Sequence, residues 1–202
     1  MLLYGASGHG KVIKEILEAQ DIVVEAFIDD NKDLQWLSGI PVLNHIDGNH
    51  NIIVSIGDNK TRKKIVEKLS CNFVNAIHPS AIVSPSAQLG EGTVVMPGAI
   101  INADAVIGKH CIINSGASID HECVIGDYCH IAPHASLCGQ VRVGEGTLIG
   151  VGASIIPCVS IGKWSIIGAG SAVVEDISDG VTVVGIPAKI IMSTNRLDYV
   201  DF

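Results

Sequence analysis

Residues 107–130 read IGKHCI INSGAS IDHECV IGDYCH, which is four consecutive blocks of six residues. Each block opens with isoleucine and has Ala or Cys at its fifth position. The pattern runs without a slip through sixteen blocks, from residue 77 to residue 172, and every block opens with Ile, Leu or Val. A period of six with an aliphatic opening residue is typical of a β-helix, because each block forms one short strand and one corner. The period therefore predicts a β-helix.

A second period of 18 residues lies inside the first. Glycine follows the opening aliphatic residue at Gly90, Gly108, Gly126, Gly144 and Gly162. Three blocks therefore make one coil, a triangular prism with three flat faces, and successive coils stack at about 4.8 Å. Residues 18 apart are expected to lie above one another.

The residue before each opening aliphatic is expected to point outward from a face. One such row is apolar except for a central histidine, and it consists of Val94, Ile112, His130, Leu148 and Ile166. A contiguous exposed apolar stripe usually marks an interface. We therefore expect this row to pack around a threefold axis in a homotrimer.

Residues 1–75 have a different organisation. A short apolar strand, a glycine-rich turn (GASGHG) and a helical pattern are followed by a second strand that ends in two acids. A further strand, glycine turn and helix repeat the theme at NIIVSIGDN and KTRKKIVEKL. Strands that alternate with helices indicate a small parallel sheet. The sequence predicts a Rossmann-like domain at 1–75, the β-helix at 76–191 and a tail at 192–202.

The composition narrows the class of protein. The formal net charge is -8, which argues against nonspecific binding to nucleic acid or to an anionic membrane. No run of apolar residues has the length of a membrane span, and the first apolar run is too short for a secretion signal. The six cysteines lack paired short spacings and are interpreted as reduced side chains. We expect a cytoplasmic protein.

His121 is the first candidate for chemistry. It is the third residue of its block, at a corner, between Asp120 and Glu122. Its expected neighbours one coil away, Ala103 and Gly139, are small and leave space around the imidazole. A histidine in such a recess suits a general base, and either acid could accept a hydrogen bond from Nδ1. The alternative is a solvated polar turn, and spacing alone leaves both open.

Other histidines and cysteines allow different interpretations. His130 and His134, with His110 or His121 of a neighbouring chain, could bind zinc across a trimer interface, as in carbonic-anhydrase-like enzymes of this fold. Cys111, Cys123 and Cys129 occupy the small fifth position, so we interpret them as packing residues.

The glycine-rich turn suggests a second site. Gly5, Gly8 and Gly10 follow a strand and open a helix, which suits phosphate oxygens at a helix N-terminus. The spacing is not that of dinucleotide-binding proteins, so a nicotinamide cofactor is not expected. Asp29 and Asp30 end the second strand, where acids commonly meet ribose or base edges. With the second turn at Gly57, these residues favour a ligand that carries a nucleotide.

Several motifs together carry a family resemblance: YGASGHG at 4–10, IDD at 28–30, SIGDNKTRKKI at 55–65, IHPSA at 77–81, NSGASIDHECVIGDY at 114–128 and VGIPAK at 184–189. In this order they resemble the sugar O/N-acyltransferases over nearly the whole chain. The nearest resemblance is to PglD-type enzymes, which N-acetylate a nucleotide-linked 4-amino sugar, and NeuD-type sialate O-acetyltransferases are relatives. The resemblance implies a left-handed β-helix.

The resemblance also implies roles for individual residues. The catalytic pair would be His121 as general base with Glu122 behind it. The nucleotide-sugar would be bound by Ser7, Gly8, His9, Asp29, Asp30 and Gly57. Acetyl-CoA would lie against His130, Gly139, Val151, Ala169, Gly185 and Pro187.

The reaction implied is direct acetyl transfer, without a metal, to the amino group of a 4-amino-4,6-dideoxy sugar. A UDP-linked sugar is favoured as the acceptor. A sialate hydroxyl is the main alternative acceptor.

Overall fold

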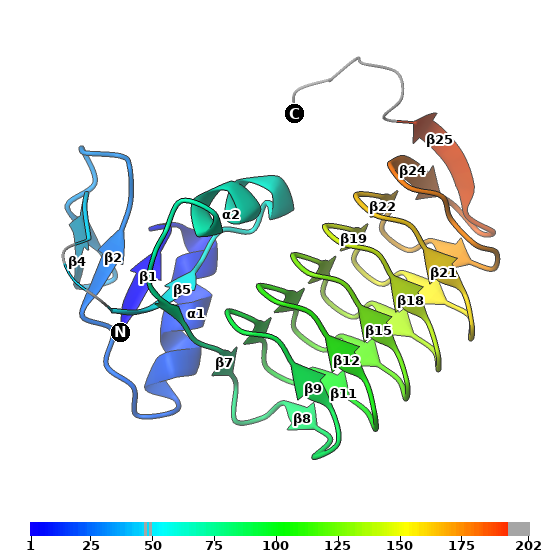
Figure 1. Cartoon of the computed structure of the whole chain (residues 1–202), viewed down its shortest axis with the longest axis horizontal. Helices are drawn as coiled ribbons and strands as arrows, with labels where there is room; N and C mark the ends of the chain where they lie inside the picture. The colour runs from blue at the N-terminus through cyan, green and yellow to red at the C-terminus, as the bar shows by residue number, and fades with distance from the viewer. Residues whose placement is uncertain (47, 49, 194–202) are drawn as a thin grey trace.

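The computed structural model describes residues 1–46, 48 and 50–193. The first part of the chain is an α/β domain built on a six-stranded sheet (Figure 1). The strand order is β3-β4-β2-β1-β5-β6, and all neighbours are parallel except the β3–β4 pair. The elements are β1 (Leu2–Tyr4), α1 (Gly8–Glu18), β2 (Ala26–Ile28), β3 (Trp36–Leu37), β4 (Ile40–Leu43), β5 (Asn51–Val54), α2 (Asn59–Val66) and β6 (Asn72–Phe73). The expected alternation of strands and helices is confirmed.

From Ala76 onward the chain winds into a parallel β-helix of two-residue strands (Figure 1). The register confirms the 18-residue period, because His130 pairs with Ile112 below it and with Leu148 above it. The first face contains β7 (Ala76–Ile77), β10 (Val94–Val95), β13 (Ile112–Ile113), β16 (His130–Ile131), β19 (Leu148–Ile149), β22 (Ile166–Ile167) and β24 (Val181–Val184), with β25 (Lys189–Ser193) antiparallel at its end. The second face contains β8 (Ile82–Val83), β11 (Ile100–Ile101), β14 (Ser118–Ile119), β17 (Ser136–Leu137), β20 (Ser154–Ile155) and β23 (Ala172–Val173). The third face contains β9 (Gln88–Leu89), β12 (Val106–Ile107), β15 (Val124–Ile125), β18 (Arg142–Val143) and β21 (Ser160–Ile161).

Three corners join these faces, and each carries a column of stacked turns. The first corner, between the third and first faces, carries His110, Tyr128 and Trp164. The second corner, between the first and second faces, carries Pro133, Val151 and Ala169. The third corner, between the second and third faces, carries Ala103, His121 and Gly139.

The core of the β-helix explains why small residues are needed at the fifth position. The thiols of Cys111, Cys123 and Cys129 are buried and donate to carbonyls of the next coil, as in the 3.1 Å contact from Cys111 Sγ to Gly126 O. Burial raises the pKa of the Cys123 thiol, which disfavours the nucleophilic thiolate. The interpretation as packing residues is confirmed. The repeated glycine also has a steric reason, because a Cβ atom at Gly108 would lie 2.6 Å from Asp127 N.

The predicted apolar stripe on the first face is not exposed along its whole length. Val94 and Ile112 are each 1% exposed, since the N-terminal domain of the same chain packs over them. They share a core with Ile13 and Phe27, and Gln20 Nε2 donates to Ile77 O at 2.8 Å. Only the far end of the stripe is open, with Ile166 44% exposed. The prediction of a fully exposed stripe was wrong because spacing within the β-helix does not report what residues 1–75 cover.

The strand pairings show where the β-helix begins and where its described part ends. β7 at Ala76–Ile77 pairs with β10 and so begins the first face. We retain the boundary at residue 75 as a proposal on this ground. Met192 and Ser193 of the predicted tail continue β25, and 194–202 lie outside the described residues. Within the described ranges, no helix is long and apolar enough to cross a membrane.

Candidate active site

His121 stands on the third corner with its ring against the next coil. The side chain is 55% exposed, and its ring covers Gly139, where a Cβ atom would lie 2.5 Å from Nε2. Ala103 accepts a backbone hydrogen bond from Glu122 N, and His121 O accepts one from Gln140 N. Both small neighbours therefore lie where the 18-residue period predicted them. The imidazole has room beside it for a second reactant.

The structure distinguishes the two acids that flank His121. Nδ1 donates to Glu122 Oε2 at 3.1 Å, so in neutral His121 the lone pair lies on Nε2. Asp120 instead accepts from the His121 backbone N–H at 2.7 Å and from Asn102 Nδ2 at 3.0 Å. Glu122 therefore orients the ring, and Asp120 fixes the backbone of the turn.

Gln140 is a part of this corner that spacing did not indicate. Its Nε2 donates to the same Glu122 Oε2 at 2.9 Å. This bond, followed by the one from His121, lowers the pKa of Glu122 and keeps the carboxylate ionised. The corner thus holds an imidazole beside a carboxylate that a neighbouring coil fixes in place.

The glycine turn after β1 forms as the sequence indicated. Gly5 has a φ of +115°, and a Cβ atom there would lie 2.9 Å from Ser55 O. Ser7 is the N-cap of α1 and makes no side-chain cap hydrogen bond, and Gly8 opens the helix. Both are exposed, and Gly57 at the end of the second turn has open space at its Cα. The turn can therefore receive an anion at the start of α1.

The two predicted acids have different surroundings. Asp29 is committed to the turns, since its carboxylate accepts from Ala6 N at 2.8 Å and from Asn31 N at 2.9 Å. Asp30 is exposed and accepts from the Tyr4 hydroxyl at 3.0 Å. Burial, with a further contribution from Asp30, raises the pKa of Tyr4 to about 12. Of the two carboxylates, that of Asp30 is more open to a ligand.

His9 and His130 lie at the junction of the N-terminal domain and the first face. Burial, with the charge of Arg62, lowers the pKa of each to about 4, so both are neutral at pH 7. His130 Nε2 therefore accepts from Asn114 Nδ2 at 3.0 Å, and its Nδ1 carries the proton. His9 Nε2 is buried without a hydrogen-bond partner in the described part of the chain. A buried nitrogen without a protein partner is commonly satisfied by an ordered water or by a ligand.

The residues predicted for the coenzyme fall on three different parts of the β-helix. Val151 and Ala169 stack on the second corner and are exposed, and Gly185 and Pro187 continue that edge beyond them. Gly139 lies under His121 on the third corner, and His130 lies on the first face. A single copy of the chain does not bring these groups together.

Comparison with known proteins places these observations in a family. The PglD N-terminal domain family matches residues 1–69, and the bacterial transferase hexapeptide family (six repeats) matches residues 86–121 and 104–139. A crystal structure of a mutant perosamine N-acetyltransferase from Caulobacter crescentus, in complex with CoA and GDP-perosamine, is 43% identical. It superposes with a TM-score of 0.91 and covers 95% of this chain and 96% of that one. The chain belongs to the PglD family.

Two further relatives have the same character. The acetyltransferase domain of PglB from Neisseria gonorrhoeae FA1090, solved with acetyl coenzyme A, is 36% identical, with a TM-score of 0.88 and coverage of 94% of this chain and 98% of that one. The UDP-N-acetylbacillosamine N-acetyltransferase of Bacillus subtilis (strain 168) is 47% identical over 107 residues, 46% of this chain. The match spans about half (50%) of the length of that curated relative.

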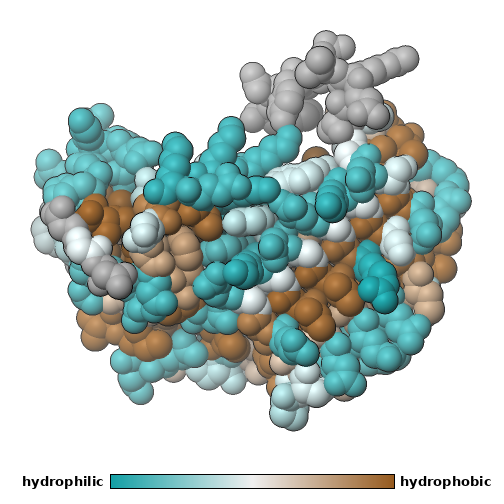
Figure 2. Space-filling model, viewed as in Figure 1, coloured by the Kyte–Doolittle hydropathy of each residue, from teal (hydrophilic) through white to brown (hydrophobic). Residues whose placement is uncertain are grey.

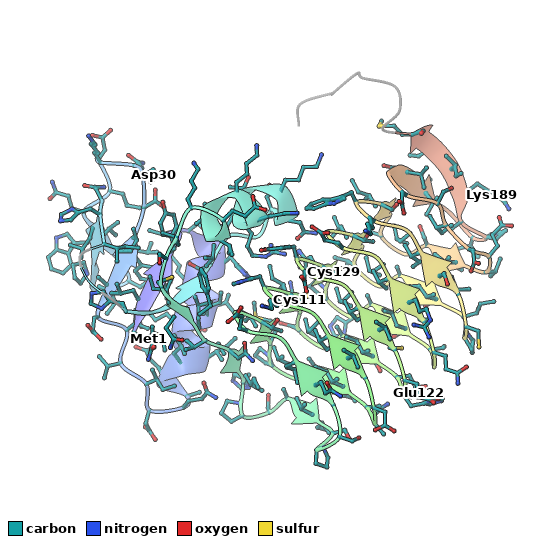
Figure 3. The ribbon with its side chains drawn as sticks, in the orientation of Figure 1. Met1, Asp30, Cys111, Glu122, Cys129 and Lys189 are labelled. Atoms are coloured by element: carbon teal, nitrogen blue, oxygen red, sulfur yellow. The ribbon has the colours of Figure 1, made fainter. Side chains whose placement is uncertain are left out.

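In this PglD-family chain the two predicted halves of the site lie apart. Figure 3 shows Asp30 in the N-terminal domain and Glu122 on the far edge of the β-helix, with the stacked coils between them. One hollow, of about 540 Å³, is lined by Gly48 and by residues 70–72. A second, of about 390 Å³, lies between α2 and Trp164. Neither is lined by a predicted site residue. The predicted substrate and catalytic residues therefore lie on separate parts of the described chain.

The histidines of the zinc hypothesis are also dispersed in the PglD-family fold. His110 is buried on the first corner, with Phe73 edge-on at 4.7 Å and Tyr128 stacked at 5.3 Å. It cannot reach a metal on the surface of another chain, so its part in that hypothesis was wrong. His134 is exposed on the second corner, and His130 already bonds Asn114.

Proposed function

We propose that the chain is an acetyl-CoA-dependent N-acetyltransferase that acts on the amino group of a nucleotide-linked 4-amino sugar. The observation that carries the proposal is the half-exposed His121–Glu122 pair above Gly139, in which Nδ1 is bonded to Glu122 and Nε2 is the nitrogen left to accept a proton. The named relatives, a perosamine and an N-acetylbacillosamine N-acetyltransferase, support the acceptor class.

The two proton transfers of the reaction can be assigned to residues of this chain. Nε2 of His121 takes a proton from the acceptor amine while the nitrogen bonds to the thioester carbonyl carbon. Glu122 stabilises the imidazolium through Nδ1–H. The C–S bond then breaks, and the imidazolium returns the proton to the departing thiolate, so the products are the amide and CoA with its thiol. A backbone N–H of a coil would stabilise the oxyanion.

A homotrimer is part of the proposal, because the predicted groups lie on separate edges of one copy. A neighbouring copy that packs against the second corner would bring its own His121 to the coenzyme edge at Val151 and Ala169. Val151, 52% exposed, and Ile186, 80% exposed, leave apolar surface on that side. Figure 2 shows that the third face, which carries β12, β15 and β18, also has apolar side chains in rows beside polar rims. Large apolar rows of this kind favour association.

The nucleotide and the acceptor follow from the resemblance and the relatives together. We keep a UDP-linked 4-amino-4,6-dideoxy sugar as the favoured substrate, and the GDP-perosamine of one relative makes guanosine the first rival. A sialate hydroxyl and a cytoplasmic location remain predictions from the sequence.

The test is a coenzyme-release assay with acetyl-CoA and a panel of UDP-, GDP- and dTDP-linked amino sugars plus sialic acid. Turnover with at least one nucleotide amino sugar, with N-acetylation confirmed by mass spectrometry, is expected. Release with sialic acid alone would move the chain to the O-acetyltransferases. No release with any acceptor, from protein that binds acetyl-CoA, would refute the proposal.

A further inference from the structure

Arg62 is a buried charge that neither the predicted site nor the family comparison accounts for. It lies in α2 and is 1% exposed. Burial lowers its pKa to about 10, so the guanidinium is still charged at neutral pH. A buried charge is costly unless hydrogen bonds compensate it. The arrangement of its partners shows how this chain meets that requirement.

Within the described residues, the acceptors of the guanidinium are all uncharged oxygens. Its acceptors come from both parts of the chain, and are the carbonyls of Ile56 (2.9 Å), Gly57 (3.0 Å), His110 (2.8 Å), Tyr128 (2.8 Å) and Cys129 (3.4 Å), and the side-chain oxygen of Asn59 (2.7 Å). Two of these acceptors lie in the turn after β5, and three lie on the first corner of the β-helix. One planar group thus holds the two parts of the chain together.

Asn59 extends the same contact by one coil. Its Nδ2 donates to Gly146 O at 3.1 Å and to Thr147 O at 3.4 Å. Together Arg62 and Asn59 bind carbonyls of three successive turns on the first corner. Figure 3 shows Cys111 and Cys129 on the coils beside α2. The start of α2 is therefore set against the coils in both position and rotation.

The turn held by Arg62 is in contact with the glycine-rich turn. Ser55 Oγ donates to Gly5 O at 2.7 Å, and a Cβ atom at Gly5 would lie 2.5 Å from Ile56 Cδ1. The two turns are therefore packed directly against each other. On the β-helix side, Cys129 directly precedes His130. The contacts of Arg62 thus run from the coil of His130 to the turns that contain Ser7, Gly8 and Gly57.

We propose that Arg62 is a positioning residue that sets the nucleotide-binding turns of the N-terminal domain at a fixed place against the coil of His130. The effect expected on turnover of the nucleotide sugar rests on the proposed function. Lysine cannot replace Arg62, because an ammonium group has three donors on one atom, whereas the guanidinium has five donors on three nitrogens and reaches six acceptors here.

The test compares Arg62→Lys with Arg142→Lys, an exposed arginine on the third face that serves as the matched control. Kinetics are measured at a temperature at which circular dichroism shows each variant to be fully folded. A displacement of about 1 Å at a reacting centre can lower rates about 100-fold. We expect Arg62→Lys to lower kcat/KM for the nucleotide sugar at least about 10-fold and to change KM for acetyl-CoA less than about twofold. Arg142→Lys should match the wild type in both.

Asn59→Ser is a second variant that tests the role of Arg62, and hydrogen exchange is a second measurement. Asn59→Ser removes one acceptor of Arg62 and the contact with the third turn, and should raise KM for the nucleotide sugar about threefold. Hydrogen exchange of residues 55–61 should be faster in Arg62→Lys and in Asn59→Ser than in Arg142→Lys, with exchange of 106–131 unchanged. If Arg62→Lys does not fold, Asn59→Ser decides the question.

The failure of this inference is distinguishable from the failure of the proposed function. Wild-type kinetic constants and exchange rates in the folded variants would show that Arg62 contributes stability alone and would overturn the positioning role. If the wild type turns over no nucleotide amino sugar, the proposed function fails, and hydrogen exchange at 55–61 still tests the role of Arg62.

Discussion

His121→Ala removes the proposed general base and little else. The imidazole is 55% exposed, and its side chain makes a hydrogen bond only to Glu122 among the interactions of the described residues. Exposed substitutions of this kind typically change stability by less than about 0.5 kcal/mol. General-base catalysis contributes about 10²- to 10⁴-fold, so kcat should fall by about that factor. Binding of acetyl-CoA should remain, because the predicted coenzyme edge at Val151 and Ala169 does not depend on the imidazole.

Glu122→Gln should have a much smaller effect, for a reason visible in the geometry. The carboxylate is 53% exposed and lies 3.1 Å from Nδ1, and exposed ion pairs are weakened by water and salt. The amide oxygen of glutamine can still accept from Nδ1–H and keep the ring in place. We therefore expect kcat to fall only about 2- to 5-fold.

The two variants and the double variant form a cycle. Single-turnover acetyl transfer measures the chemical step, and isothermal titration measures coenzyme affinity in each protein. In the double variant the Glu122 change should add nothing to the His121 change, because the carboxylate acts through the ring. Unchanged transfer in His121→Ala would refute the general base. A loss in Glu122→Gln as large as that in His121→Ala would refute the supporting role of the carboxylate and assign it a direct part in the reaction.

Three further predictions test other parts of the structure. Gly139→Ala should displace the His121 imidazole, because the new Cβ would lie 2.5 Å from Nε2. We expect kcat to fall at least about 10-fold while the melting temperature is unchanged. A kcat equal to that of the wild type would show that the ring is not held over Gly139. Burial lowers the pKa of His110 to about 4 in the folded chain, whereas the ordinary value in the unfolded chain is about 6.5. Between these two pH values the unfolded chain binds a proton that the folded chain does not. The free energy of unfolding therefore decreases as the pH falls from about 6.5 to 4. From pH 7.5 to pH 5 the melting temperature of His110→Phe should fall less than that of the wild type, by at least about 3 °C. His134→Gln, a change at an exposed histidine, is the control. Equal falls in His110→Phe and the wild type would show that His110 does not cause the pH dependence. Sedimentation equilibrium should give three times the 21.2 kDa of one chain, and a monomer with full activity would refute the shared site.

Much of the fold could be predicted from the sequence because the β-helix is a local repeat. Each coil contacts the coils directly before and after it, so a period of 18 residues is also a list of neighbours in space. The position of His121 over Gly139 followed from that rule alone. The family resemblance favours the role of general base for His121 over that of a solvated turn, and it also names Glu122 as the supporting acid. The 3.1 Å contact between Glu122 and Nδ1 in the structure distinguishes Glu122 from Asp120.

Contacts between the N-terminal domain and the β-helix could not be predicted in the same way. Val94 and Ile112 have the same pattern as Ile166, yet they are buried and Ile166 is exposed, because the N-terminal domain covers one end of the first face. In the sequence Arg62 is one of four basic residues in KTRKKI, and its burial follows from contacts with the coils of the β-helix.

The sequence by itself determined the stack of coils, the corner on which His121 stands and the glycine turn before α1. These features depend on the side-chain period and on backbone sterics, which are properties of neighbouring residues. Only the tertiary structure decided which apolar residues are covered, which buried charge joins the two parts and how far His121 lies from the nucleotide turn. Those features depend on contacts between residues 48 to 88 positions apart, for which the chain carries no repeating signal.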